Sequence, residues 1–168
     1  MMKYLQKLGK ALMLPVAVLP ICGLLMGIGY ALCPATMQGG DIKGVIPLIG
    51  LFLVKAGAAL IDNMALLFVI GVGVGLSKDN DGTGGVGALA SWLMITTLLN
   101  TGFVTTIMPA IAENANKTLA FDKIVNPFIG ILAGIIGSTC YNKFKDTKLP
   151  DWLSFFSGKR CVAIVAGV

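Results

Sequence analysis

The stretch LGKALMLPVAVLPICGLLMGIGYAL, residues 8–32, decides the class of the fold. Its part from Ala11 to Leu32 is 22 residues long and carries no charge, which is enough for a helix to cross a hydrocarbon core of about 30 Å. Three lysines precede it, as in a signal peptide, but the apolar run is longer than the usual core of such a peptide. The stretch therefore predicts the first span of a membrane protein.

Two prolines inside this stretch indicate how the first span is built. Pro15 falls near the start of the span, where a missing amide hydrogen costs little. Pro20 lacks the hydrogen that would bond to the carbonyl oxygen of Val16, so it predicts a kink. A membrane tolerates such a kink when neighbouring helices or polar groups satisfy the freed backbone. The prolines therefore favour a helix bundle over an isolated anchor.

The composition of the whole chain supports a membrane as its solvent. Hydrophobic residues make up 56% of the 168 residues and charged residues only 12%, which leaves too little polar surface for a water-soluble globule. The net charge of +5 comes from basic residues in short clusters between apolar runs, so it does not predict a nucleic-acid-binding stripe. Membrane lipid is an expected partner, and nucleic acid is not.

The residue types that usually carry catalysis are scarce. The chain has no histidine, which removes the commonest general base and the commonest metal ligand. Its four cysteines form no CxxC pair, and at least two lie inside apolar runs, so neither a disulfide framework nor a zinc site is indicated. We therefore expect no catalytic residue, no metal and no cofactor in this chain.

Further apolar runs predict an all-α, polytopic membrane helix bundle. The run Val45–Ile61 is weakened by Lys55 near its centre, because a lysine there costs about 3 kcal/mol on an insertion scale. We therefore expect the second span at Ala56–Leu76 and a short amphipathic or re-entrant piece at Val45–Val54. The other expected spans are Val86 to about Pro109, Ile124–Asn142, and the start of a fifth at Val162–Val168.

The positive charges indicate an orientation. With a cytoplasmic N-terminus, the inside segments hold nine lysine or arginine residues and the outside segments hold three, when Lys55 at the membrane is set aside. Cytoplasmic loops carry such an excess of basic residues. The count therefore supports four complete crossings that begin in the cytoplasm.

Small residues one helical turn apart indicate close helix packing. Each GxxxG motif lets helix backbones approach one another. Their occurrence in three expected spans favours tight packing inside one bundle, with dimerisation as an extension of the same idea. The six expected packing glycines are Gly23, Gly27, Gly71, Gly75, Gly130 and Gly134.

One acidic residue falls inside an expected span. Asp62 lies about a third of the way into Ala56–Leu76, with Lys55 and Asn63 as candidate partners. An ionisable group within a membrane span is by default a functional hypothesis. The alternative is a hydrated, structural residue near the outer interface, and the off-centre position favours this alternative.

An aromatic segment with basic flanks follows the fourth expected span. Trp152, Leu153, Phe155 and Phe156 group at helical spacing behind a proline, with a glycine after them and lysines on both sides. Aromatic and basic residues favour the membrane–water interface. Residues 143–160 are therefore expected to lie along the cytoplasmic interface, as an anchor or as a lever between two membrane domains.

Three extended motifs resemble one known family. They are LQKLGKALMLPVAVLPICGLLMGIG (Leu5–Gly29), IDNMALLFVIGVGVGLSKDNDG (Ile61–Gly82) and YNKFKDTKLPDWLSFFSGKR (Tyr141–Arg160). In order and approximate spacing they are similar to the first half of the IIC membrane component of the bacterial sugar phosphotransferase system, in its glucose, N-acetylglucosamine and maltose branch. The resemblance covers nearly the whole chain.

The resemblance implies transport coupled to phosphorylation. Members of the family import a sugar across the bacterial cytoplasmic membrane and phosphorylate it with a phosphoryl group that passes through IIA and IIB components. Their IIC unit is a homodimer whose first half is chiefly scaffold and whose second half holds the sugar site. Residues 1–168 resemble only the first half and lack the GITEP-like sugar motif. The substrate-binding residues are therefore expected in the second half, and the particular sugar is not predicted.

Two functions remain open at this stage. The first is the N-terminal scaffold half of a sugar permease, inactive without its second half. The second is a stand-alone membrane interaction or regulatory protein derived from such a permease. The chain ends at Val168, a few residues into an apolar run, which we interpret as truncation.

Overall fold

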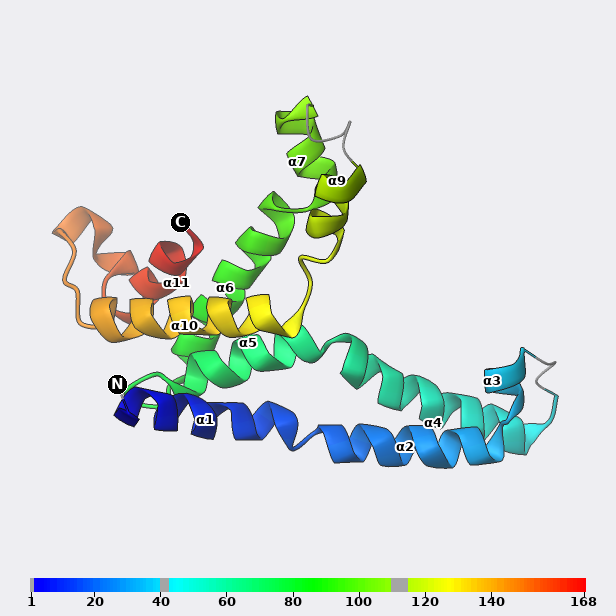
Figure 1. Ribbon diagram of the computed structural model, residues 1–168. Coiled ribbons are helices and arrows are strands. Elements are labelled where there is room, and N and C mark those ends of the chain that lie inside the picture. Colours follow the sequence, from blue (N-terminus) through cyan, green and yellow to red (C-terminus); the bar gives the residue numbers. More distant parts are fainter. Residues whose placement is uncertain (1, 40–42, 110–114) are drawn as a thin grey trace. The chain divides into compact units, whose positions relative to one another are not determined.

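A computed structural model describes residues 2–39, 43–109 and 115–168. Within these ranges the regular structure is helical and no strand is present, as the sequence predicts (Figure 1). The chain divides into two compact units. Met13–Met64 is called here the hairpin unit, and Met1–Leu12 together with Ala65–Val168 is called the core unit.

The hairpin unit is built on two helices whose backbones touch. Its elements are the end of α1 (Met2–Val16), α2 (Leu19–Leu32), α3 (Ala35–Gln38) and α4 (Val45–Asp62). The helices α2 and α4 lie side by side (Figure 1). A Cβ atom on Gly29 would lie 2.7 Å from the carbonyl oxygen of Gly50, and one on Gly57 would lie 2.9 Å from that of Cys22. Only glycine permits this approach, so α2 and α4 pack backbone against backbone.

The first helix is interrupted where Pro20 predicts it. α1 ends at Val16, and α2 begins at Leu19 with Pro20 in its first turn. The missing proline hydrogen has no helical partner in a first turn, so the interruption removes the conflict with Val16. The expectation for Pro15 is wrong, because α1 already begins at Met2 and Pro15 therefore lies near its end.

The boundaries expected for the second span are also wrong. Val45–Val54 is part of an 18-residue helix, α4, that continues through Lys55 to Asp62. Lysine is a good helix former, so Lys55 does not interrupt the helix. The helix ends at Asn63. The side-chain Nδ2 and the backbone N–H of Asn63 both donate to the carbonyl oxygen of Ala59, at 2.8 Å and 3.3 Å. Asparagine competes in this way with the helix hydrogen bonds, and it ends α4 inside the expected span.

The core unit contains the remaining helices and the charged segments between them. Its elements are the start of α1, α5 (Met64–Gly75), α6 (Gly82–Leu98), α7 (Thr101–Ile107), α9 (Ala115–Asp122), α10 (Pro127–Phe144), the 3₁₀ helix η1 (Asp151–Phe156) and α11 (Lys159–Gly167). Val69, Ala88 and Ala133 form a buried cluster where α5, α6 and α10 meet. The α1 residue Ala11 is buried against Val72 and Leu76 of the α5 side.

The third and fourth expected spans differ from the helices at their ends. The third is broken after Leu98, and α6 and α7 meet at 57°. Asn100 causes the restart, because its Oδ1 accepts a hydrogen bond from the Gly102 N–H at 2.9 Å and caps α7. In the fourth, α10 starts at Pro127 behind the cap Asn126 and continues to Phe144. The third expected span ends at about Pro109, the last described residue before the gap at 110–114.

Two helical segments in the described ranges are long and apolar enough to cross a membrane: Met2–Leu32, which is α1 and α2 taken together, and Val45–Asp62, which is α4. The pair α6 and α7 makes a third if the bent pair is one span.

Candidate functional site

Polar residues of the core unit gather where α5, α6, α10 and α11 meet the loop that follows α5. Asp81 begins α6, and its Oδ1 accepts hydrogen bonds from the backbone N–H and the hydroxyl of Thr83, both at 2.9 Å. This is a standard helix N-cap. Asn80 lies just before it with a φ of 48°, a conformation that asparagine adopts more readily than most residues. The loop is therefore a defined turn that presents Asp79 and Asp81 to α10.

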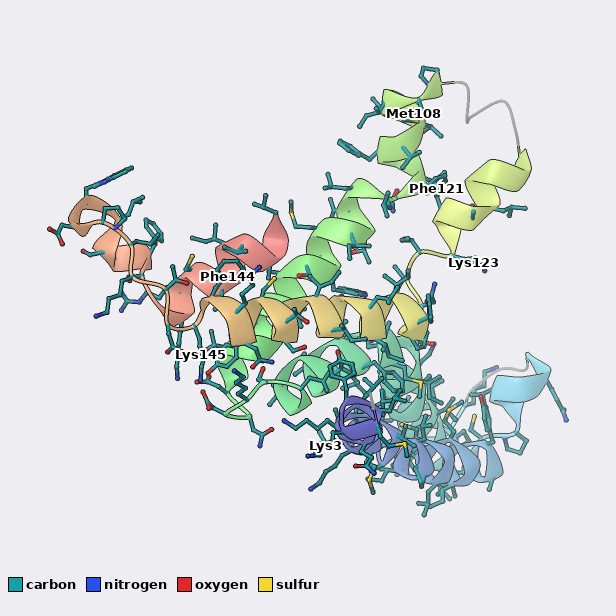
Figure 2. The ribbon with its side chains drawn as sticks, turned by 60° about the vertical axis from the view of Figure 1, so that its left-hand side comes forward. Lys3, Met108, Phe121, Lys123, Phe144 and Lys145 are labelled. Atoms are coloured by element: carbon teal, nitrogen blue, oxygen red, sulfur yellow. The ribbon has the colours of Figure 1, made fainter. Side chains whose placement is uncertain are left out.

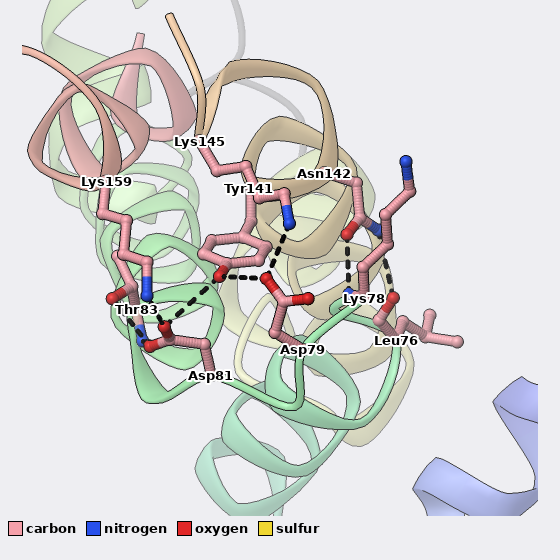
Figure 3. Close-up of polar contacts among 9 residues, drawn as sticks. All are labelled: Leu76, Lys78, Asp79, Asp81, Thr83, Tyr141, Asn142, Lys145 and Lys159. Atoms are coloured by element: carbon pink, nitrogen blue, oxygen red, sulfur yellow. Dashed lines mark hydrogen bonds and ion pairs between the residues drawn. The ribbon is translucent and has the colours of Figure 1, made fainter.

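Tyr141 of α10 reaches both aspartates. Its side chain is fully buried, and its hydroxyl lies 3.1 Å from Oδ2 of Asp79 and 3.3 Å from Oδ2 of Asp81 (Figure 3). One phenol can share its single hydrogen between two nearby carboxylates. The tyrosine therefore connects two acidic groups that would otherwise repel each other.

Two lysines complete what we call the charge cluster: Asp79, Asp81, Tyr141, Lys145 and Lys159. Lys145, next to Phe144 at the end of α10 (Figure 2), places its Nζ 2.6 Å from Oδ2 of Asp79. Lys159, at the start of α11, forms an ion pair with Oδ2 of Asp81 (Figure 3). The cluster therefore ties the end of α10 and the start of α11 to one loop.

Electrostatic interactions in the charge cluster favour the charged forms of its two aspartates and two lysines. None of these four residues lies in the interior of a helix. Hydrogen bonds from Lys145 and then Tyr141 lower the pKa of Asp79, and those from Lys159 and then Thr83 lower the pKa of Asp81. In return, Asp79 raises the pKa of Lys145 and Asp81 raises the pKa of Lys159. The side chains are solvent-exposed to different degrees, so water and salt weaken each pair.

Asn142 fixes the other end of the loop. Its Oδ1 accepts a hydrogen bond from the backbone N–H of Lys78 at 2.8 Å, and its Nδ2 donates to the carbonyl oxygen of Leu76 at 3.1 Å (Figure 3). Ser77 is buried, and its hydroxyl donates to the carbonyl oxygen of Gly73 at 2.6 Å. The backbone from Leu76 to Asp81 is therefore held from both sides.

The expected packing glycines occupy different surroundings. A Cβ on Gly130 would lie 2.5 Å from the carbonyl oxygen of Ala65, and one on Gly134 would lie 2.7 Å from Cβ of Val72. A Cβ on Gly75 would meet Ala11 at 2.5 Å. Gly71 is half-buried. Gly23 and Gly27 are exposed, and no atom of the described residues would lie within 4 Å of a Cβ on either.

The polar residues expected inside the second span are not joined to one another by ion pairs in the described part of the chain. Lys55, Asp62 and Asn63 are all exposed, and within the described ranges neither Lys55 nor Asp62 makes an ion pair or a side-chain hydrogen bond. Asn63 caps α4. Lys55 lines a hollow of about 500 Å³ together with Tyr30, Thr36 and other hairpin residues.

The aromatic segment forms a closed loop. Gly158 N–H donates to the carbonyl oxygen of Thr147 at 2.9 Å, and the Ser157 hydroxyl donates to the same oxygen at 3.0 Å. Trp152 and Phe155 project outward with exposed fractions of 82% and 68%, and Phe156 is also exposed. The guanidinium of Arg160 lies 4.7 Å from the ring centre of Phe155. The aromatic residues therefore lie in a loop with one short 3₁₀ helix, η1, rather than on a longer amphipathic helix.

Sequence reasoning missed the charge cluster. Asp79 and Tyr141 are 62 residues apart, and no local pattern joins them. The nearest available signal was the pair of aspartates in a glycine-rich turn. In the described ranges, no group of three or more histidine, cysteine, aspartate or glutamate side chains is placed to hold a metal ion.

Comparison with known proteins gives the family of the chain. The family model described as "Phosphotransferase system, EIIC" matches residues 9–168. The chain belongs to this EIIC family. The matched region includes the charge cluster, the glycine contacts and both apolar helices of the hairpin unit. EIIC components are membrane proteins, which agrees with the apolar helices of this chain.

Three curated bacterial proteins are similar to the EIIC chain. It is 38% identical over 168 residues to the N-acetylglucosamine-specific EIICB component of Bacillus subtilis (strain 168), covering 100% of the chain and 30% of that protein. It is 35% identical over 164 residues to the N-acetylglucosamine-specific EIICBA component of Escherichia coli (strain K12), covering 98% and 20%. It is 34% identical over 176 residues to the glucose-specific EIICBA component of Staphylococcus carnosus (strain TM300), covering 96% and 25%. The EIIC chain spans less than a third of the length of each.

Proposed function

We propose that this EIIC chain is the N-terminal scaffold half of a phosphotransferase-system sugar permease in the bacterial cytoplasmic membrane. The permease would import and phosphorylate a hexose-type sugar of the glucose, N-acetylglucosamine or maltose class. The observation that carries the proposal is the 38% identity, over all 168 residues, to an N-acetylglucosamine-specific EIICB component. Relatives of glucose and of N-acetylglucosamine specificity match about equally well, so we assign no single sugar.

The scaffold role is supported by the packing of the core unit. Glycines at the contacts of α10 with α5, and of α5 with the start of α1, let the helices touch backbone to backbone. The charge cluster adds polar ties at one end of the same helices. Helices packed so closely resist sliding, which suits a part that stays fixed while another part of a transporter moves.

The proposal includes partners and an orientation. The relatives are EIICB and EIICBA components, so we propose that IIB and IIA components supply the phosphoryl group. We further propose a homodimer, surrounded by lipid, whose N-terminus is cytoplasmic and whose described part supplies about four spans and the start of a fifth. The excess of lysine and arginine in the segments assigned to the inside supports this orientation.

A chimera tests the function. The aligned part of the Bacillus subtilis N-acetylglucosamine-specific EIICB component is replaced by residues 1–168 of this chain, and N-acetylglucosamine uptake is measured in a strain that lacks its own permease. A scaffold half should restore uptake, because the sugar site would come from the host protein. A matched chimera in the Staphylococcus carnosus glucose-specific component should take up glucose.

The controls separate a scaffold from other roles. Residues 1–168 expressed alone should give no phosphoenolpyruvate-dependent uptake of either sugar. Chimeras that both fail, although they reach the membrane at the level of the host proteins, would contradict the scaffold role and favour a stand-alone interaction protein. A sugar preference that follows this chain rather than the host would show that a sugar-selecting site has been missed.

A further inference from the structure

A hollow of about 330 Å³ in the core unit is lined by three lysines. Lys7 and Lys10 come from α1, and Lys78 comes from the loop after α5. The rest of the lining is Ala11, Gly75, Ser77 and Asn80, so no carboxylate faces the hollow. A concentration of positive charge without an acidic lining residue is the arrangement that attracts an anion.

No residue in the described part of the chain neutralises the charges of the three lysines. Within the described ranges, none of their ammonium groups has a hydrogen-bond acceptor or an ion-pair partner. The acidic groups nearest in sequence to Lys78 are Asp79 and Asp81, and both are engaged by Lys145, Lys159 and Tyr141 (Figure 3). The charge cluster therefore removes the two carboxylates that could have paired with Lys78.

The walls of the hollow are held in place before any ligand arrives. Asn142 holds the backbone of Lys78 through a 2.8 Å hydrogen bond, and the hydroxyl of Ser77 is bound to Gly73. Gly75 and Ala11, which both line the hollow, pack closely together, because a Cβ on Gly75 would lie 2.5 Å from that of Ala11. A site with a fixed backbone loses less entropy when it binds than a flexible loop does.

We propose that Lys7, Lys10 and Lys78 bind the phosphate of an anionic phospholipid headgroup. The start of α1 carries Lys7 and Lys10 together with exposed apolar side chains, since Met2 and Leu5 are 76% and 62% exposed and Tyr4 is 48% exposed. Apolar groups beside a basic hollow match a ligand that has both a phosphate and acyl chains. Basic pockets at the ends of membrane helices bind anionic headgroups. The inference rests on membership of a membrane family and not on the sugar.

Binding of fluorescent phosphatidylglycerol to the full 168-residue chain in uncharged detergent tests the proposal. The variant K7Q/K10Q/K78Q is compared with K123Q/K143Q/K148Q, which loses the same three charges at exposed lysines elsewhere in the core unit. A basic residue near an anionic surface contributes about a fivefold factor in affinity. We expect about a hundredfold loss of affinity for the first variant and less than about fivefold for the second.

Two further binding measurements distinguish a lipid phosphate from free inorganic phosphate. Fluorescent phosphatidylcholine should bind weakly to all three proteins, because its headgroup has no net charge. Excess inorganic phosphate should leave phosphatidylglycerol bound; its displacement at millimolar phosphate would overturn the lipid proposal in favour of a free phosphate. Equal losses of phosphatidylglycerol affinity in the two triple variants, with an unchanged helical circular dichroism signal, would overturn the proposed site. Neither result would change the outcome expected for the sugar-uptake chimeras.

Discussion

Tyr141 shows how one hydroxyl organises a set of charges. It is fully buried and touches Asp79 and Asp81, so Y141F removes the polar link and leaves the ring in place. A net contribution of about 1 kcal/mol is typical of one hydrogen bond. We expect Y141F to lower the free energy of unfolding by about this amount, measured by urea titration in detergent. Y4F is the control because Tyr4 is exposed, and equal stability of Y141F and the parent protein would contradict the link.

The two aspartates predict how stability responds to acid. Their pKa values in the folded chain lie below the ordinary 3.8, so folding favours their charged forms. This stabilisation is complete above 3.8 and disappears as the pH falls through the lower folded values. We expect the thermal unfolding midpoint to be steady above about pH 5 and to fall below about pH 4.

The acid response is assigned by comparing two double variants. D79N/D81N should flatten the fall in the unfolding midpoint, because the amides no longer change charge. D146N/D151N removes two exposed aspartates that make no ion pair in the described part of the chain and should keep the slope of the parent. Identical slopes for both variants would rule out the charge cluster as the origin of the response.

At the scale of helices, the contact between α5 and α10 depends on Gly134. A leucine there would overlap Val72, since even a Cβ would lie 2.7 Å from that residue. Overpacking of this kind costs about 1–3 kcal/mol. We expect G134L to lower the thermal unfolding midpoint measured by circular dichroism in detergent.

The matched variant is G27L on α2. No atom of the described residues would lie within 4 Å of a Cβ at Gly27, so the midpoint should stay close to that of the parent. Because Gly27 is exposed on an apolar helix, it is also a candidate contact in the proposed homodimer. A reduced crosslinked-dimer fraction for G27L with unchanged thermal stability would support that interface, whereas an unchanged dimer fraction would exclude this face.

At the scale of the whole molecule, the distribution of basic residues predicts a topology. Alkaline phosphatase is active only when it is exported, so fusions report the side of each loop. A fusion after Lys123 should be active and a fusion after Lys148 inactive, because the first segment is assigned to the outside and the second to the cytoplasm. The reverse pattern would overturn the proposed orientation.

The features that were predictable from the sequence are those set by local chemistry. Proline has no backbone N–H in any surroundings, and the helix is interrupted just before Pro20. Asn63 was also a local signal, in this case for the end of a helix. The expected span was chosen by hydropathy instead, and it ran through Asn63, the residue that ends α4. The charge cluster was not predictable, because Asp79 meets Tyr141 only after α5, α6 and α10 have packed. The glycine contacts were only partly predictable. The GxxxG spacing identified Gly130 and Gly134. It did not identify the hairpin-unit glycines, whose contacts are made between two helices: Gly29, Gly50 and Gly57.

The ties at Lys145 and Lys159 make the aromatic loop between them a practical insertion site. Asp79 and Asp81, two positions apart in one loop, hold its two ends, and the Thr147 carbonyl closes it independently. Extra residues placed next to Ser154, which is exposed, would lengthen the loop without pulling on α10 or α11. An epitope tag or a small fluorescent reporter carried there would interrupt η1 but would label the chain while leaving α10 and α11 in register.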